Sequence, residues 1–130
     1  MVANAANGIF YCASQIGVTD IEDGTTNTYL FGEKYLNPDS YTNGTDLGDN
    51  ESMYVGENGD ISRWSGPTYP PYQDRPGFVT WQSFGSAHPG SFNMVFCDGK
   101  VRSINYDVDS TLHGRLANRR DGSAVDATAY

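Results

Sequence analysis

The histidine at position 88 is the residue whose type and surroundings best suit chemistry. Pro89 and Gly90 follow it directly, and nine residues separate it from the pair Asp98-Gly99. A histidine can serve as a general base or as a metal ligand near neutral pH. The sequence, however, holds neither an HExxH segment nor a nucleophile elbow. We therefore expect His88 to shape a turn, with its ring hydrogen-bonded to neighbouring backbone or to Asp98, and we expect no catalytic residue in this chain.

A second set of chemically capable side chains lies in the acidic, glycine-rich segment 37–77. Calcium binds six to eight oxygen atoms, which flexible loops can supply. The spacing does not match an EF-hand, which needs donors at alternate positions and a glutamate at the twelfth. The sequence leaves two alternatives, which are a solvated acidic loop and a Ca2+ site with the candidate ligands Asp46, Asp49, Asn50, Glu51 and Asp60.

Aromatic side chains accompany the polar residues of this segment and of the segment that follows it. Large rings beside Asp and Asn side chains can stack on the pyranose rings of a polysaccharide. They can equally pack a loop that lacks aliphatic side chains, because each ring buries a large area. Both alternatives stay open for the four candidate stacking residues, Trp64, Tyr69, Tyr72 and Trp81.

The two cysteines, Cys12 and Cys97, lie far apart in the sequence, each within an apolar and aromatic stretch. Neither belongs to a CxxC pair, so a zinc site is not expected. A disulfide between them would close a long loop and contribute roughly 4–5 kcal/mol in the chain-entropy model. The alternative is a pair of free buried thiols, which behave as small hydrophobic groups.

The composition excludes several classes of function. The 130 residues include 16 acidic and 8 basic side chains, a formal net charge of -8. Nucleic-acid binding needs a basic surface that displaces counterions from phosphates, and an anionic membrane surface would repel this chain. No stretch approaches the ~18 apolar residues of a membrane span, and the N-terminus lacks the features of a signal peptide. An exported form would therefore carry its exporting segment outside this sequence.

Hydrophobic patterns and turn signals predict an α+β fold in a single domain, residues 1–130. Asp109 is a suitable N-cap for a helix that ends near residue 118, and a capping-box pattern at Thr19 allows one or two helical turns. Prolines and glycines interrupt 37–77, which we expect to be an irregular insert between the core segments 8–36 and 78–122. A small antiparallel sheet is expected from strands within 8–14, 27–36, 78–84, 92–97 and 100–105.

The strongest local pattern is the pair Asp98-Gly99 between two apolar runs, which predicts a hairpin with a type I′ turn. A two-residue loop would place Phe96 opposite Val101. The first run is apolar on both faces, which indicates an interior strand. The second carries Lys100 and Arg102 on one face, which indicates that this face is partly wet.

Three blocks together resemble the prepilin-type processing-associated domain, a family defined by a His, nine residues and Asp-Gly. The first block runs from Asp20 to Glu33, the second from Phe84 to Arg102, and the third from Leu116 to Gly122. The sequence departs from the family pattern at Ser91 and Lys100. The matching motif residues are His88, Pro89, Gly90, Asn93, Asp98, Gly99, Asp23, Gly24, Asn27, Glu33, Asn118, Arg119, Asp121 and Gly122.

The resemblance implies a pseudopilin-like head that follows a prepilin leader and an N-terminal hydrophobic helix. Family members are inserted in the membrane, clipped and built into filaments through that helix, with the head in the periplasm or outside the cell. It therefore implies a non-catalytic, extracytoplasmic subunit of a type IV pilus or type II secretion-like filament, or of another surface structure. Its partners would be other pilin-like subunits. The alternative is a calcium-dependent or aromatic-lined module that binds polysaccharide or another macromolecule, since some pseudopilins bind calcium in a loop.

Overall fold

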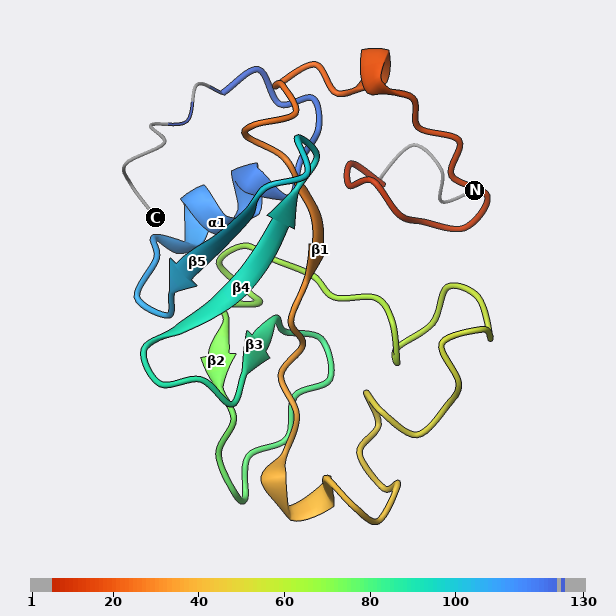
Figure 1. The fold of residues 1–130 in the computed structure, drawn as a ribbon, viewed down its shortest axis with the longest axis vertical. Helices are drawn as coiled ribbons and strands as arrows, with labels where there is room; N and C mark the ends of the chain where they lie inside the picture. Colours follow the sequence, from red (N-terminus) through yellow and green to blue (C-terminus); the bar gives the residue numbers. More distant parts are fainter. Residues whose placement is uncertain (1–5, 124, 126–130) are drawn as a thin grey trace.

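A three-stranded antiparallel sheet forms the centre of the structure, with its strands in the order β1-β4-β5 (Figure 1). The computed structural model describes residues 6–123 and 125. The central position of β4 confirms the prediction of an interior strand. Together with the helix α1 and a second, smaller sheet, this arrangement confirms the α+β class. The three strands span Tyr29–Gly32 (β1), Ser91–Phe96 (β4) and Val101–Asn105 (β5).

The hydrophobic core lies on the face of this sheet that α1 covers. Side chains alternate between the two faces of a strand, and β4 accordingly buries every second residue, Phe92, Met94 and Phe96. Ile104 of β5 and Leu116 of α1 pack against these three side chains. Burial of each such side chain contributes about 1.5–3 kcal/mol, so this cluster is the main source of stability.

The helix α1 spans Ser110–Leu116. It begins at the predicted N-cap, because Oδ1 of Asp109 accepts a hydrogen bond from the Leu112 amide at 2.8 Å. Such a cap is worth about 1 kcal/mol. The helix ends two residues before the predicted end at position 118, where the Asn118 amide bonds to the Arg115 carbonyl.

The β4–β5 hairpin forms as predicted, but its register differs by one residue. Val95, not Phe96, lies opposite Val101. The Gly99 amide donates to the Phe96 carbonyl at 2.9 Å, and Gly99 has a φ of 80°. Among the described non-glycine residues only Ala13 has a positive φ, so Asp98 cannot occupy a type I′ position. The loop is therefore a three-residue one, a type I turn followed by glycine in the left-handed region.

This register places Arg102 on the core side of β5, the same side as Ile104. Its guanidinium carbon lies 4.0 Å from the centroid of the Phe96 ring. The face of β5 that was predicted to be partly solvent-exposed is thus the buried face, and Val101 lies on the exposed face. The stem of an arginine can cover apolar surface in this way while its head stays polar.

Two of the predicted strands are not formed. Residues 8–14 turn back on themselves, because the Ser14 amide donates to the Tyr11 carbonyl at 2.9 Å. Residues 78–84 are irregular and instead use their carbonyls for the insert, as when the Trp64 amide donates to the Gln82 carbonyl at 2.8 Å. The predicted strand 27–36 is shortened to β1 and contains a bulge between Tyr29 and Phe31.

The insert 37–77 contains only short regular elements, as its prolines and glycines predict. These are the 3-10 helix η2, Pro38–Ser40, and the strand β2, Tyr72–Gln73. β2 pairs in parallel with β3, Gly85–Ser86, and a Cβ on Gly85 would collide with the Tyr72 carbonyl, so this close approach requires glycine.

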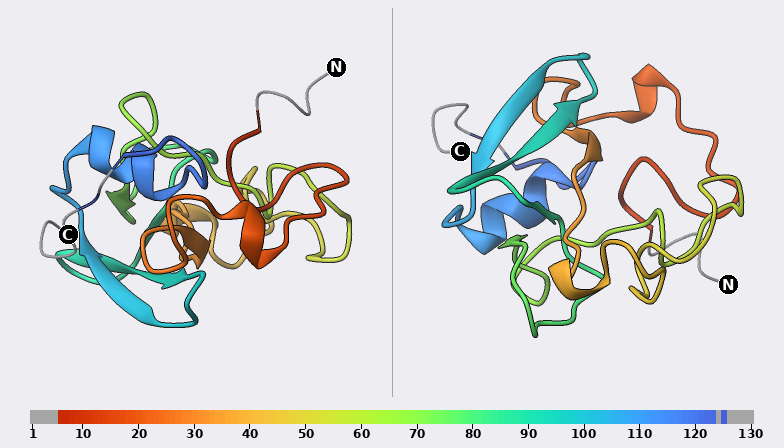
Figure 2. Two further views of the ribbon diagram at one scale, coloured as in Figure 1. Left: turned by 90° about the horizontal axis from the view of Figure 1, so that it is seen from above. Right: turned by 60° about the horizontal axis from the view of Figure 1, so that its bottom comes forward.

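The N-terminal segment, residues 6–17, and the insert lie side by side at one edge of the central sheet (Figures 1 and 2). The N-terminal segment leads into the 3-10 helix η1, Val18–Asp20, which confirms the short helical turn expected near Thr19. None of the helices in the described ranges is long and apolar enough to cross a membrane.

Candidate functional site

Glu33, just beyond β1, joins the His88 loop to the central strand β4. Its Oε1 lies 3.2 Å from Nε2 of His88, and its Oε2 accepts a hydrogen bond from the Asn93 amide at 2.6 Å. The Asn93 side chain also donates to Oε1 at 3.3 Å. The His88 ring is exposed and its partner is Glu33, whereas the sequence predicted neighbouring backbone or Asp98, so this prediction was wrong.

Ser86 and Tyr106 form hydrogen bonds that fix the backbone of the His88 loop. Oγ of Ser86 accepts from the His88 amide at 3.1 Å and donates to the Ser91 carbonyl at 3.2 Å. The single hydrogen of the Tyr106 hydroxyl is within reach of the carbonyls of Ser86, at 3.0 Å, and His88, at 3.1 Å, and burial raises the pKa of this hydroxyl. Gly90 takes a φ of 81° where the loop turns into β4. The nearby serine thus serves the loop backbone rather than the histidine ring.

Replacing Glu33 by glutamine is expected to destabilise the protein by about 1–2 kcal/mol, because hydrogen bonds to a charged acceptor are stronger than neutral ones. Urea denaturation monitored by tryptophan fluorescence measures the loss. The matched control is Glu22→Gln, since Glu22 is exposed in a turn that precedes β1. Equal stabilities for the two variants would contradict a structural role for Glu33.

Asp98 uses both carboxylate oxygens inside the hairpin. Oδ1 accepts from the Lys100 amide and Oδ2 from Nη2 of Arg102, each at 2.9 Å. The hydrogen bond from the Lys100 amide, followed by the contact with Arg102, lowers the pKa of Asp98 below its ordinary value. This carboxylate shapes the turn, with Gly99 as its left-handed partner.

Asp23 connects the first motif block to the third. Its two carboxylate oxygens accept hydrogen bonds from the amides of Asp121 and Gly122, each at 2.8 Å. The block is also braced from within, because the Asn27 side chain donates to the Asp23 carbonyl at 3.2 Å. Gly24 and Gly122 have φ values of 90° and 71°, which suit glycine. These residues close the fold where its C-terminal segment returns to the N-terminal half.

Arg119 attaches the N-terminal segment to the rest of the protein. The side chain is 5% exposed, and its Nη1 donates to the carbonyls of Ala6 at 3.1 Å and Gly8 at 2.6 Å. Its amide donates to the Asn7 carbonyl at 2.9 Å. Asn118, the preceding motif residue, accepts a hydrogen bond on Oδ1 from the Arg120 amide at 3.1 Å.

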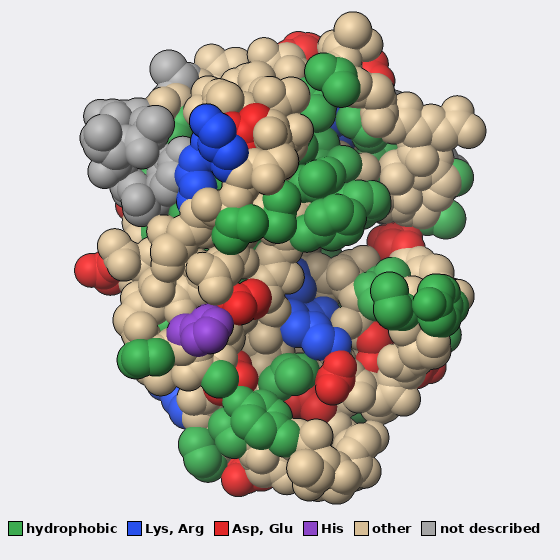
Figure 3. All heavy atoms as spheres, in the orientation of Figure 1, with side chains coloured by type: hydrophobic (Ala, Val, Ile, Leu, Met, Phe, Trp, Pro, Cys, Tyr) green, Lys and Arg blue, Asp and Glu red, His purple; other side chains and the backbone are tan. Residues whose placement is uncertain are grey.

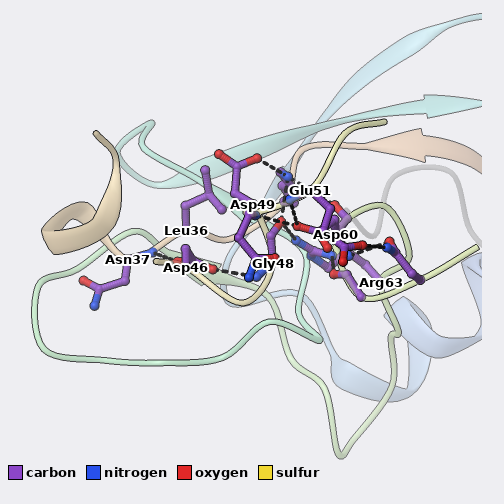
Figure 4. A network of polar contacts seen from close by, with 12 residues as sticks. Leu36, Asn37, Asp46, Gly48, Asp49, Glu51, Asp60 and Arg63 are labelled. Atoms are coloured by element: carbon purple, nitrogen blue, oxygen red, sulfur yellow. Dashed lines mark hydrogen bonds and ion pairs between the residues drawn. The ribbon is translucent and has the colours of Figure 1, made fainter. Parts of the chain in front are cut away.

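Several acidic residues of the insert lie in one polar network with Arg63 (Figure 4), and Lys34 joins this network through Asp49. Nζ of Lys34 donates to Oδ1 of Asp49 at 2.5 Å and to the Gly48 carbonyl at 2.7 Å. Arg63 donates to the same Gly48 carbonyl at 3.0 Å. Desolvation lowers the pKa of the Arg63 guanidinium, and its Nε has no partner among the described residues.

Two further acidic residues of this network, Asp46 and Asp60, accept hydrogen bonds from backbone amides. Oδ1 of Asp60 accepts from the amides of Asn50 at 2.6 Å and Glu51 at 3.0 Å. Asp46 accepts from the amides of Asn37 at 2.9 Å and Gly48 at 2.8 Å. The Glu51 side chain accepts a hydrogen bond from the Asn58 side chain. Each carboxylate in this network is therefore engaged by the chain's own donors.

The predicted calcium site is not formed by the described residues. Across residues 6–123 and 125, no three His, Cys, Asp or Glu side chains are grouped as a metal ion would require. In the alternative that treated the segment as a calcium site, the oxygen donors were considered without the two cations and the backbone amides that the fold brings to them. The candidate ligands placed in this way are Asp46, Asp49, Asn50, Glu51 and Asp60.

The four aromatic residues predicted to stack on sugars are not on one surface. Trp64 packs edge-on against Trp81, with ring centroids 5.4 Å apart, and is tilted against Tyr69 at 6.0 Å. Tyr72 belongs to a different cluster, in which its ring contacts Phe78 at 5.0 Å. The alternative, in which aromatic rings pack a loop poor in aliphatic residues, describes Trp81 and Tyr72. Of the four, only Trp64 is exposed.

The two cysteines are free thiols, and no disulfide joins Cys12 to Cys97. Cys12 is exposed, unlike the buried thiol expected in the second alternative. Cys97 is half-buried, and desolvation, with a further contribution from Asp98, raises the pKa of its thiol. The pairing fails because residues 8–14 do not form the strand that would have carried Cys12 into the sheet.

Sequence reasoning missed His113, the buried histidine of α1, and the aromatic pair Phe10 and Tyr11. His113 is fully buried, with Nδ1 3.3 Å from the Tyr29 hydroxyl. Its position between Leu112 and Leu116 on the core-facing side of the helix was the available signal. Phe10 and Tyr11 were assigned to a short strand, whereas they line a cleft beside the insert.

The geometry defines an α+β protein whose motif residues hold distant parts of the chain together. A family model described as a protein of unknown function (DUF1559) matches residues 2–111, so the chain belongs to this family. The family is associated with pilin-like and prepilin-type proteins. The match leaves the narrower prepilin-type processing-associated family a prediction. Searches of curated proteins and of solved structures found no significant match.

Proposed function

We propose that this chain is the extracytoplasmic head of a pilin-like subunit, built into a type IV pilus or type II secretion-like filament or another surface structure, and that it has no catalytic role. Family membership supports the pilin-like class. The non-catalytic part rests on the observation that the motif carboxylates bond to other motif residues, mostly to their backbone amides. Glu33 holds the His88 loop and Asp23 holds the Gly122 backbone, so both carboxylates serve the scaffold.

The environment of His88 also supports a non-catalytic role. The ring is exposed, and His88 lines neither of the two cavities beside the N-terminal segment. A general acid or base usually works in a concave site that excludes water. Under this proposal, the longer protein would carry a hydrophobic helix outside this sequence, and this helix would contact other subunits and anchor the protein in the membrane.

The exposed thiol of Cys12 offers a direct test of location. In intact cells that express the full-length gene product, we expect a membrane-impermeant maleimide to label the protein, because Cys12 is accessible and Cys97 is half-buried with a raised thiol pKa. Cys12→Ser is the control that should abolish labelling. Mass spectrometry should show a clipped N-terminus that stays intact when the prepilin peptidase is deleted. An unlabelled, unprocessed protein that fractionates with the cytoplasm would overturn the proposal.

A further inference from the structure

A cleft with a volume of about 570 Å³ lies between the N-terminal segment and residues 57–65 of the insert. This volume falls within the range of small-molecule sites. A second cavity of about 640 Å³ adjoins it and shares Phe10, Tyr11 and Glu57 in its lining. The two form a groove that reaches β1, and Figure 3 shows a hollow with basic side chains at its bottom and hydrophobic ones above. Such a groove suits an extended ligand.

Three aromatic rings line the first cleft, and two of them pack against a further ring. Trp64 is 42% exposed, while Trp81 packs against it at 5.4 Å. Phe10 is 58% exposed and stacks on Phe31, with centroids 4.9 Å apart and planes 24° apart. Tyr11 lies 5.6 Å from the Arg119 guanidinium. Rings held in this way lose little conformational freedom when a ligand stacks on them.

Hydrogen-bonding groups stand beside these rings. Asn7 and Glu57 are exposed, and neither side chain has a hydrogen bond or ion pair to another described residue. Ser62, Arg63 and Ser65 complete the polar part of the lining. The cleft therefore combines apolar faces with carboxylate, amide and hydroxyl groups that are free to accept or donate. The lining contains one carboxylate, that of Glu57, and one guanidinium, that of Arg63, so it selects for no net charge on the ligand.

We propose that this cleft binds a neutral oligosaccharide. The C–H face of a pyranose ring is apolar and stacks on an aromatic ring, while its hydroxyls suit a free carboxylate and amide. A net charge of -8 disfavours anionic polymers. The site differs from the one expected from the sequence, because the N-terminal rings replace Tyr69, Tyr72 and Trp81 as stacking faces. It requires no metal, and it does not depend on assembly of the head into a filament.

The two tryptophans allow a direct test by fluorescence, because the chain contains only these two. In Trp81→Phe, Trp64 is the sole reporter, and titration with cellohexaose, xylohexaose, mannohexaose or chitohexaose should shift its emission for at least one sugar. In Trp64→Phe, the emission of Trp81 should not respond. Binding should persist in EDTA. If none of the four sugars changes Trp64 emission or gives heat in calorimetry, the proposal is wrong.

Affinity measurements on the otherwise unchanged chain identify the residues that bind. We expect Phe10→Ala and Trp64→Ala each to weaken binding about tenfold and Glu57→Gln to weaken it severalfold. The matched control is Tyr54→Ala, because Tyr54 is 87% exposed in the same insert and lines neither cavity. Thermal melting identifies variants that fail to fold. If Trp64→Ala fails to fold, the affinity of Phe10→Ala decides whether the rings of the cleft bind the sugar. Equal losses in Tyr54→Ala, or a preference for polygalacturonate or an apolar peptide over all four sugars, would overturn the proposal.

Discussion

Acidification from pH 7 to about pH 4 is expected to remove roughly 3 kcal/mol of folding stability through His113 alone. This side chain is fully buried between the rings of Tyr29, Phe84 and Phe92. Its Nδ1 lies 3.3 Å from the Tyr29 hydroxyl, while Nε2 has no hydrogen-bond partner among the described residues. Burial in this apolar setting lowers the pKa of His113 from 6.5 to about 4.

The direction of the effect follows from the two pKa values. An unfolded chain binds a proton at this histidine once the pH falls below 6.5, whereas the folded protein resists protonation until about pH 4. The unfolded state therefore binds more protons between these values, and stability falls as the pH is lowered. The contribution is fully present above pH 6.5. Over about 2.5 pH units at 1.36 kcal/mol each, the loss amounts to roughly 3 kcal/mol.

The substitution His113→Gln keeps a polar side chain of similar size but removes the titration. Urea denaturation at pH 7 and at pH 4.5 should show a smaller drop in the variant than in the unchanged protein, whatever its absolute stability. The matched control is His88→Gln, because His88 is the other histidine and is exposed. NMR should show a His113 ring that stays neutral down to about pH 4. A drop of the same size in the unchanged protein and in His113→Gln would contradict this account.

The sequence predicts correctly those elements whose structure depends on residues close together along the chain. Asp109 caps α1 through the amide of Leu112, three positions along the chain. The hairpin was found because Asp98-Gly99 favours a tight turn between apolar runs. Its register was missed because the Asp-Gly pair is compatible with both a type I′ turn and a type I turn followed by glycine. In the structure Asp98 bonds to the Lys100 amide, which stabilises the type I turn.

The contacts that define the candidate sites join residues far apart in the sequence. Glu33 and His88 were both recognised as motif residues, yet nothing in either segment predicts that they bond to each other. The polar network of the acidic segment could not be predicted for the same reason, since Lys34 and Arg63 enter it only through the fold. The buried state of His113 likewise depends on the sheet that α1 covers.

Replacing Arg119 by alanine is expected to cost about 3 kcal/mol, because two hydrogen bonds from a buried cation are lost together. The guanidinium holds the carbonyls of Ala6 and Gly8, and the Arg119 carbonyl accepts from the Asp23 amide at 3.1 Å. Truncation would leave both N-terminal carbonyls without this donor. We expect denaturation to begin at lower urea concentration and amide hydrogen exchange to accelerate in residues 6–12.

The neighbouring residue provides a matched control. Arg120 is exposed, so Arg120→Ala should change the free energy of unfolding by less than about 0.5 kcal/mol. Arg119→Lys keeps the charge and should recover part of the loss. If Arg119→Ala and Arg120→Ala give the same stability and the same exchange rates in residues 6–12, Arg119 does not attach the N-terminal segment.

Arg119 also links the two proposals physically. Phe10 and Tyr11 form one wall of the cleft, and Arg119 fixes the segment that carries them. Releasing this segment should therefore weaken oligosaccharide binding even though Arg119 itself lies outside the cleft lining. In the proposed subunit, the same segment would connect the head to its filament helix. The Arg119→Ala variant should thus lose affinity and gain mobility between head and helix together, whereas Trp64→Ala should lose affinity alone.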